Sequence, residues 1–193
     1  AKMIQDFPNL EFIGGGEESF GYMVGDFVRD KDAVTSALLA CEIAAAAKSN
    51  GSSFYDTLLE LYAKHSFYKE RLVSFTKKGI DGAAQIKQIM IDLRKNPLTH
   101  IDGSRVTYVN DYDASTEKNM NTREVTIMNL PKSNVLIYHT EDGTKVAARP
   151  SGTEPKIKFY FSVQSQLDSV ENAIEKEQEL EAKIDRIITE MAI

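Results

Sequence analysis

Seven consecutive residues near the C-terminal end, Arg149-Pro-Ser-Gly-Thr-Glu-Pro155, combine groups that suit an anionic ligand. Arg149 carries a planar fork of N–H donors that matches phosphate oxygens in pairs. Ser151 and Thr153 add hydroxyl donors, and Gly152 allows backbone N–H groups to turn toward one anion. The segment therefore predicts a phosphate-binding loop, although Ser-Gly-Thr without its neighbours would favour a tight turn whose polar residues only satisfy each other.

The residues next to this loop favour phosphate binding. Pro150 and Pro155 restrict the backbone, so less conformational entropy is lost when a ligand binds. Lys156 and Lys158 alternate with apolar residues in the segment that follows. This alternation places both ammonium groups on one face of the expected strand, close to the loop.

A second segment, Gly14-Gly-Gly-Glu-Glu-Ser-Phe-Gly21, contains four glycines in eight residues. Glycine lets the backbone adopt positive φ and approach a ligand closely. The spacing matches neither a dinucleotide-binding motif nor a P-loop, and two adjacent carboxylates would repel a phosphate. Glu17, Glu18 and Ser19 suit a neutral polyol, because carboxylates accept hydrogen bonds from hydroxyls. Composition alone supports a sugar-binding loop and a solvated acidic loop equally.

Charges alternate in Arg29-Asp-Lys-Asp32, just before an expected helix. One interpretation is a surface cluster of ion pairs with acidic residues at a helix start, which contributes little to stability. The other is that Arg29 or Lys31 points a cation into the same cleft as Glu17.

The pattern along the rest of the chain predicts the elements that must position these segments. Apolar periodicity and breaker residues indicate helices over residues 33–48, 54–65, 79–95 and 168–191. Runs of β-branched and aromatic residues, several of them alternating, indicate strands over residues 11–13, 67–75, 104–112, 135–140, 144–148 and 156–163. We expect Asp32 and Ser53 to precede helices, and Asn50-Gly51 and Asn96-Pro97 to end them.

These elements predict two domains, with a boundary near residues 96–102. Residues 1–100 are expected to be α/β and incomplete, because the chain begins in what resembles the tail of an amphipathic helix. Residues 101–193 are expected to form an antiparallel sheet with helices. The last helix could form a coiled coil, but its apolar spacing lasts only about three heptads, which favours packing on its own sheet.

Composition limits the classes of partner. The net charge of −6 argues against a nucleic-acid surface, because phosphate backbones are bound through clustered Lys and Arg. No apolar run reaches the roughly 18–20 residues that cross a bilayer, so we expect no membrane segment. The single Cys41 allows no internal disulfide, which predicts a reducing, cytoplasmic location.

Three motifs together resemble the α-D-phosphohexomutases, the family of phosphoglucomutases and phosphomannomutases. They are Gly-Glu-Glu-Ser-Phe-Gly at 16–21, Arg-Asp-Lys-Asp at 29–32 and Arg-Pro-Ser-Gly-Thr-Glu-Pro-Lys at 149–156. The resemblance covers nearly the whole chain. It implies that residues 1–100 are the latter part of the third domain of such an enzyme. Residues 101–193 would be the fourth domain, with a fold like that of TATA-binding protein.

The resemblance also implies roles for individual residues. Glu17 and Ser19 match the pair that binds sugar hydroxyls, and Lys31 matches a lysine of the active-site cleft. The phosphate-binding residues would be Arg149, Ser151, Gly152 and Thr153, together with Lys158, which stands where some relatives have an arginine. The family moves a phosphoryl group between the C1 and C6 oxygens of a hexose through a phosphoserine and a bisphosphate intermediate. It implies Mg²⁺ and a sugar 1,6-bisphosphate activator, with glucose, mannose or pentose phosphates all open as substrates.

The residues that carry the family's chemistry are missing from these 193 residues. There is no Ser-His-Asn-Pro loop for the nucleophile and no Asp-x-Asp-x-Asp-Arg loop for magnesium. Asp111–Glu117 only superficially resembles a cation loop, and we expect a solvated hairpin connection there, with no metal site and no catalytic residue in the chain. We therefore expect an inactive C-terminal portion whose partners are the N-terminal domains of the same protein. The alternative is a non-catalytic module that binds or senses phosphosugars.

Overall fold

A computed structural model describes residues 7–17, 21–77 and 81–191 of the chain. The chain divides into two compact units, one up to Glu60 and one from Leu61 onward. The first unit contains the hairpin of β1 (Gly14–Gly16) and β2 (Tyr22–Val24), helix α2 (Ala33–Ser49) and the start of α3 (Phe54–His65).

The glycine-rich segment forms a strand, which differs from the expected arrangement of a strand over 11–13 followed by a loop. Gly14 pairs with Val24 and Gly16 with Tyr22, because the backbone N–H and C=O groups of β2 pair with those of the glycines. The hairpin continues past the strands, where the Glu17 N–H donates to the Gly21 carbonyl at 2.8 Å. Glu17 therefore stands at the tip of a hairpin.

The helices of the first unit begin and end where local signals place them. The Asp32 carboxylate accepts a hydrogen bond from the Val34 N–H at 3.0 Å, and Gly51 adopts a φ of 72° just beyond α2. Ser53 and Asp56 form a reciprocal capping box at the start of α3, with N–H to side-chain distances of 2.9 and 3.1 Å. Local hydrogen bonding alone is enough to explain these boundaries.

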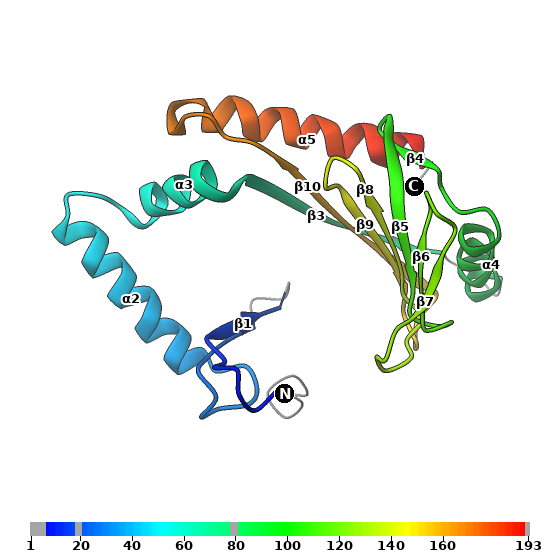
Figure 1. The fold of residues 1–193 in the computed structure, drawn as a ribbon, viewed down its shortest axis with the longest axis horizontal. Helices are drawn as coiled ribbons and strands as arrows, with labels where there is room; N and C mark the ends of the chain where they lie inside the picture. Colours follow the sequence, from blue (N-terminus) through cyan, green and yellow to red (C-terminus); the bar gives the residue numbers. More distant parts are fainter. Residues whose placement is uncertain (1–6, 18–20, 78–80, 192–193) are drawn as a thin grey trace. The chain divides into compact units, whose positions relative to one another are not determined.

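The second unit is built on an antiparallel sheet (Figure 1). Its strands follow the order β3-β10-β9-β8-β5-β6-β7, and β4 pairs with β5 off this path. In chain order the strands are β3 (Phe67–Thr76), β4 (His100–Ile101), β5 (Ser104–Asp111), β6 (Thr116–Asn119), β7 (Val125–Ile127), β8 (Leu136–Thr140), β9 (Lys145–Pro150) and β10 (Lys156–Ser165). The helices are α4 (Gly82–Lys95) and α5 (Ala173–Glu190), the latter preceded by the 3₁₀ turn η1 (Val170–Asn172). This mixed architecture, an antiparallel sheet with helices, confirms the predicted fold class.

The longest pairing of the sheet joins strands that the sequence analysis assigned to different domains. β3 pairs with β10 from Phe67 opposite Ser165 to Thr76 opposite Lys156. The structure therefore divides the chain well before residue 100, because β3 and α4 fold with the C-terminal sheet. The change of character seen near residues 96–102 is a turn within one compact unit.

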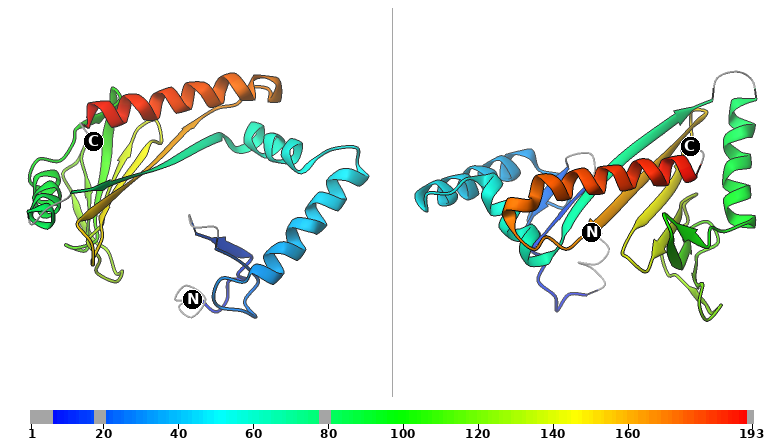
Figure 2. Two further views of the ribbon diagram at one scale, coloured as in Figure 1. Left: turned by 180° about the vertical axis from the view of Figure 1, so that it is seen from behind. Right: turned by 90° about the horizontal axis from the view of Figure 1, so that it is seen from above.

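One face of the sheet is covered by both helices, and the other, which we call the open face, is not. Along β10, Ile157, Phe159, Phe161 and Val163 are buried on the covered face, and the alternating residues are half-buried on the open face. Helix α5 lies along β10 and β3 (Figure 1 and Figure 2), with Leu180, Ile184 and Ile187 buried against them. As expected, the last helix packs on its own sheet, although Ile174 in its first turn remains 69% exposed.

Charged side chains attach α5 to two parts of the sheet, strand β3 and the turn between β8 and β9. Lys69 and Arg71 of β3 form ion pairs with Glu177, Glu181 and Asp185 of the helix. Lys183 of the helix forms an ion pair at 2.5 Å with Asp142, which lies in the turn between β8 and β9. Burial raises the pKa of Asp142, but hydrogen bonds from Lys183, Thr140 and the Thr144 N–H outweigh it and hold this pKa well below the ordinary value of 3.8.

Helix α4 is fixed at both ends. At its C-terminal end the buried Tyr138 hydroxyl donates to the Leu93 carbonyl at 2.9 Å, and burial raises the pKa of Tyr138 to about 12. At its N-terminal end Gly82 packs against the backbone of Lys77 and against Pro155, the last residue of the predicted phosphate loop. Lys77 in turn donates its N–H to the Pro155 carbonyl at 2.9 Å. The end of β3, the start of α4 and the end of the loop therefore pack as one junction.

We expect Gly82→Ala to destabilise this junction. A Cβ at Gly82 would lie 2.1 Å from the Lys77 carbonyl oxygen, so backbone has to move. The free energy of unfolding should fall by about 1–3 kcal/mol, as for other overpacked sites, even though Ala favours a helix over Gly. Urea denaturation measures this change, with Gly152→Ala as the control because a Cβ at Gly152 meets nothing within 4 Å. A stabilised Gly82→Ala protein would contradict the close packing.

Candidate functional site

The predicted phosphate loop connects two neighbouring strands of the sheet. Arg149 and Pro150 are the last residues of β9, and β10 begins at Lys156, so the loop proper spans residues 151–155. This differs from the expected arrangement, in which strand 144–148 ended before Arg149. Arg149 is therefore held by the sheet ladder, because its position pairs with Lys158 on β10.

Arg149 and Lys158 lie directly opposite each other on the open face of the sheet. Lys156 lies two residues before Lys158 on the same face of β10. Like charges on directly opposed residues destabilise a strand pair. Among the described residues, none of these three cations has a carboxylate partner, whereas Lys69 and Arg71 on the covered face do. A ligand anion would offset this repulsion.

These cations line a pocket of about 310 Å³ at the end of the sheet. The pocket lining comprises Arg149, Pro150, Ser151, Gly152, Glu154, Lys156 and Lys158. The structure thus brings together four of the five predicted phosphate-binding residues. The fifth, Thr153, is exposed and lies outside the lining.

The loop is held by its own hydrogen bonds. Ser151 donates its N–H to the Lys156 carbonyl at 2.8 Å, and Lys156 donates its N–H to the Glu154 carbonyl at 2.7 Å. The Ser151 hydroxyl oxygen accepts from the N–H groups of Thr153 at 3.4 Å and Glu154 at 3.3 Å. Because that oxygen is an acceptor here, the hydroxyl hydrogen remains available to a ligand. The Ser151 hydroxyl can therefore hold the loop through its oxygen and, at the same time, donate its hydrogen to an anion.

The predicted sugar-binding residues belong to the first unit. Lys31 Nζ lies 3.5 Å from Glu17 Oε1 and 3.1 Å from Asp30 Oδ1, and these carboxylates, Asp30 first, raise the pKa of Lys31. The Lys31 stem crosses Gly21 so closely that a Cβ there would lie 2.2 Å from Cδ. Glu17 and Lys31 are thus brought together, while Ser19 lies outside the described residues.

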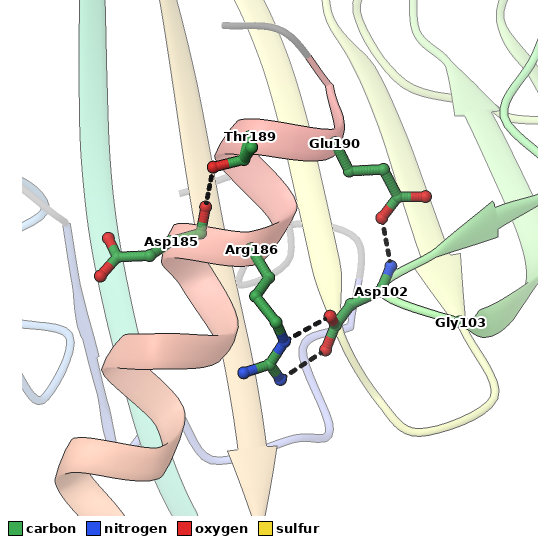
Figure 3. A pocket seen from close by; sticks show the side chains of 6 residues that line it. All are labelled: Asp102, Gly103, Asp185, Arg186, Thr189 and Glu190. Atoms are coloured by element: carbon green, nitrogen blue, oxygen red, sulfur yellow. Dashed lines mark hydrogen bonds and ion pairs between the residues drawn. The ribbon is translucent and has the colours of Figure 1, made fainter.

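In another pocket of the second unit, the charged groups of the lining pair with one another. Asp102, Gly103, Asp185, Arg186, Thr189 and Glu190 line a pocket of about 510 Å³ between the β4–β5 turn and the end of α5 (Figure 3). The Arg186 fork donates to both Asp102 oxygens at 2.7 and 2.8 Å, and the Asp102 N–H donates to Glu190 at 2.7 Å (Figure 3). These groups satisfy one another, so the pocket serves to attach the helix. In the pocket at Arg149, by contrast, the charged side chains form no ion pair with any residue that the structure describes.

Neither a metal site nor a membrane span is found in the part of the chain that the structure describes. Within residues 7–17, 21–77 and 81–191 no three His, Cys, Asp or Glu side chains are placed to hold a metal ion. None of the described helices has the length and apolar character needed to span a bilayer. Asp111, from the segment that resembles a cation loop, instead accepts hydrogen bonds from Arg94 at 2.9 and 3.2 Å. These residues do not fit a magnesium site.

Sequence reasoning missed one residue of the pocket, Glu154. A carboxylate is not expected among groups that bind an anion, so the residue type alone gave no reason to include it. Its position inside the seven-residue motif was the available signal.

We expect Ser151→Ala to loosen the phosphate loop. Loss of the hydroxyl acceptor frees the N–H groups of Thr153 and Glu154, so their amide hydrogens should exchange roughly threefold to tenfold faster. Exchange measured by NMR checks this, and the amides of Phe159 and Phe161 in β10 serve as an internal control. Unchanged exchange at both loop amides would show that Ser151 does not hold the loop.

Known proteins resemble this chain in sequence and in fold. The family model for phosphoglucomutase/phosphomannomutase, alpha/beta/alpha domain III, matches residues 2–64. A phosphoglucomutase of Staphylococcus epidermidis is 36% identical over 156 residues, which cover 81% of this chain and 28% of the relative. A phosphoglucomutase of Staphylococcus haemolyticus is 37% identical over 166 residues, covering 84% of this chain and 30% of the relative.

A solved structure shares the fold over almost the whole chain. The open form of the exocytosis-sensitive phosphoprotein pp63/parafusin, a phosphoglucomutase from Paramecium, superposes with a TM-score of 0.58 at 17% identity. The match covers 97% of this chain and 32% of the Paramecium protein. The chain thus spans less than a third of the length of the curated relatives it matches. On the evidence of its sequence matches, the chain belongs to the phosphoglucomutase/phosphomannomutase family.

Proposed function

We propose that this chain is the phosphosugar-binding C-terminal portion of a phosphohexomutase. The observation that carries this proposal is the pair of opposed cations Arg149 and Lys158 beside the Ser151–Gly152 loop, neither of which has a carboxylate partner within the described part of the chain. Two cations and a hydroxyl around one small pocket suit a phosphate monoester. The relatives named phosphoglucomutase act on a ligand of this kind, which supports the assignment.

In this proposal the phosphate loop binds the phosphate that does not react. Arg149 donates two parallel hydrogen bonds from its fork, and Lys158 adds a point charge from the opposite strand. Ser151 donates its hydroxyl hydrogen, and the backbone at Gly152 can approach the anion because no side chain intervenes. Thr153 joins the site only if the loop turns its side chain inward.

Glu17 and Ser19 bind sugar hydroxyls, and Lys31 holds Glu17 in place. The ion pair between Lys31 and Glu17 restricts the carboxylate at the hairpin tip. A carboxylate accepts hydrogen bonds from any suitably placed hydroxyl, so this contact tolerates a sugar in more than one orientation. Such tolerance suits a reaction in which the bisphosphate intermediate has to turn round.

The reacting serine and the Mg²⁺ site belong to a longer protein in this proposal. When bound there, the metal would supply charge stabilisation for phosphoryl transfer. Helix α2 agrees with such a protein, because of its seventeen residues only Ala47 is buried, and Val34 and Leu38 are 78% and 60% exposed. Apolar side chains exposed along a helix generally mark a surface that other elements cover. The first unit would then be part of the third domain and the second unit the fourth.

The second candidate is a stand-alone module that binds phosphosugars without catalysis. One observation favours this candidate: among the described residues, all those that line the phosphate pocket belong to the second unit. Mass spectrometry of the protein made from its own gene separates the two candidates. A product of about 193 residues would exclude the mutase assignment.

We expect Arg149→Ala to weaken the binding of glucose 1-phosphate by at least about tenfold. Hydrogen bonds to charged groups contribute about 1.5–3 kcal/mol each, and the fork supplies two. NMR titration or calorimetry of the folded chain measures the dissociation constant. Arg149→Lys should give an intermediate value, because the charge stays and the fork is lost. Arg105→Ala, an exposed arginine outside the pocket, is the matched control, and equal affinities for both alanine variants would remove Arg149 from the site.

We expect the 193-residue chain to show no turnover by itself. The sequence lacks the loop that supplies the phosphoserine, so no group in it should exchange a phosphoryl group with the sugar. A coupled assay with glucose 1-phosphate, Mg²⁺ and glucose 1,6-bisphosphate measures this. Formation of glucose 6-phosphate by the pure chain would mean that a serine within these residues acts as the nucleophile.

A further inference from the structure

The phosphate pocket contains a carboxylate, Glu154, among its cations. Glu154 lines the pocket together with Arg149, Lys156 and Lys158. Among the described residues, the Glu154 carboxylate forms neither an ion pair nor a side-chain hydrogen bond. It is therefore available to a ligand in the same way as the cations.

The backbone of Glu154 is held on both sides. Its N–H donates to the Ser151 hydroxyl oxygen at 3.3 Å, and its carbonyl accepts from the Lys156 N–H at 2.7 Å. Pro155, which follows it, is fixed by the Lys77 N–H and packs against Gly82. The backbone that carries the carboxylate is therefore anchored next to the pocket.

A carboxylate beside an anion needs a compensating contact. Ionised Glu accepts hydrogen bonds but donates none, and a sulfate dianion has no hydrogen to offer it. Between Glu154 and such an anion only repulsion remains. A phosphate ester of a polyol differs, because a hydroxyl near the phosphate can donate to the carboxylate while the cations hold the phosphate.

We propose that Glu154 is a specificity-determining residue, which makes the pocket prefer a phosphate monoester with a neighbouring hydroxyl over sulfate, a tetrahedral anion that carries no hydrogen. This rests on the proposed phosphate-binding function of the pocket. Glu154 accepts a hydrogen bond from the ligand hydroxyl, and the same charge disfavours sulfate. The pocket thereby distinguishes its ligand from an anion that has the same tetrahedral shape as the phosphate group but no hydrogen to donate.

Binding of two probes to the wild-type chain and to Glu154→Gln tests this inference. The probes are sulfate, which has no hydroxyl, and glucose 1-phosphate, each titrated at one ionic strength and followed by NMR. Removing the charge should strengthen sulfate binding by about fivefold, through loss of a screened repulsion. Binding of glucose 1-phosphate should not improve, so its preference over sulfate should fall by at least about fivefold. Glu154→Ala, which removes the acceptor as well, should lower the preference further.

Glu70→Gln is the matched control, because Glu70 is an exposed glutamate of β3 outside the pocket and its replacement changes the net charge equally. Its preference for glucose 1-phosphate should equal that of the wild type, and amide spectra establish that each variant is folded. The inference is overturned if Glu154→Gln strengthens the binding of both probes by the same factor, or strengthens the binding of neither. The proposed phosphate pocket stands in both of these cases. If the wild-type chain binds neither probe, the proposed function of the pocket is overturned as well.

Discussion

The ladder between β3 and β10 is the constraint on which the rest of the second unit depends. β10 pairs with β3 over ten positions and with β9 over six, so its register is determined on both sides. A slip of one residue would turn Lys156 and Lys158 to the covered face and Phe159 to the open face. Because the apolar residues of β10 have to stay buried, the cations are held beside Arg149.

The two faces of the sheet use positive charge differently. On the covered face Lys69 and Arg71 are paired with carboxylates of α5, and there charge attaches a helix. On the open face Arg149 and Lys158 oppose each other without a partner among the described residues. The first arrangement is complete within the described residues, whereas in the second a bound anion would offset the repulsion between the cations. This contrast distinguishes the proposed binding pocket from the larger hollow at Asp102 and Arg186.

Much of the local structure could be predicted because local interactions cause it. Asp32 and Ser53 cap their helices through side-chain contacts two or three residues away, which a sequence displays directly. The strand at Gly14–Gly16 was missed because glycine has no propensity for strands, and pairing with Tyr22–Val24 overrides that preference. The short strands β4, β6 and β7 were missed because two to four residues carry too little pattern to recognise. The boundary expected near residue 100 separated β3 from the sheet to which it belongs. The pairing of β3 with β10, about ninety residues away, leaves no local signal in the sequence.

The sequence by itself determined which residue types the two motifs combine, and Arg, Ser and Gly in one short loop favour an anionic ligand. It also established membership of the family, since the motifs keep their order and spacing. Only the tertiary structure decided which groups meet. It placed Lys158 opposite Arg149, left Thr153 outside the pocket and brought Glu154 into it. The physical reason is that strand register and loop hydrogen bonds, which depend on distant partners, set the direction in which each of these side chains points.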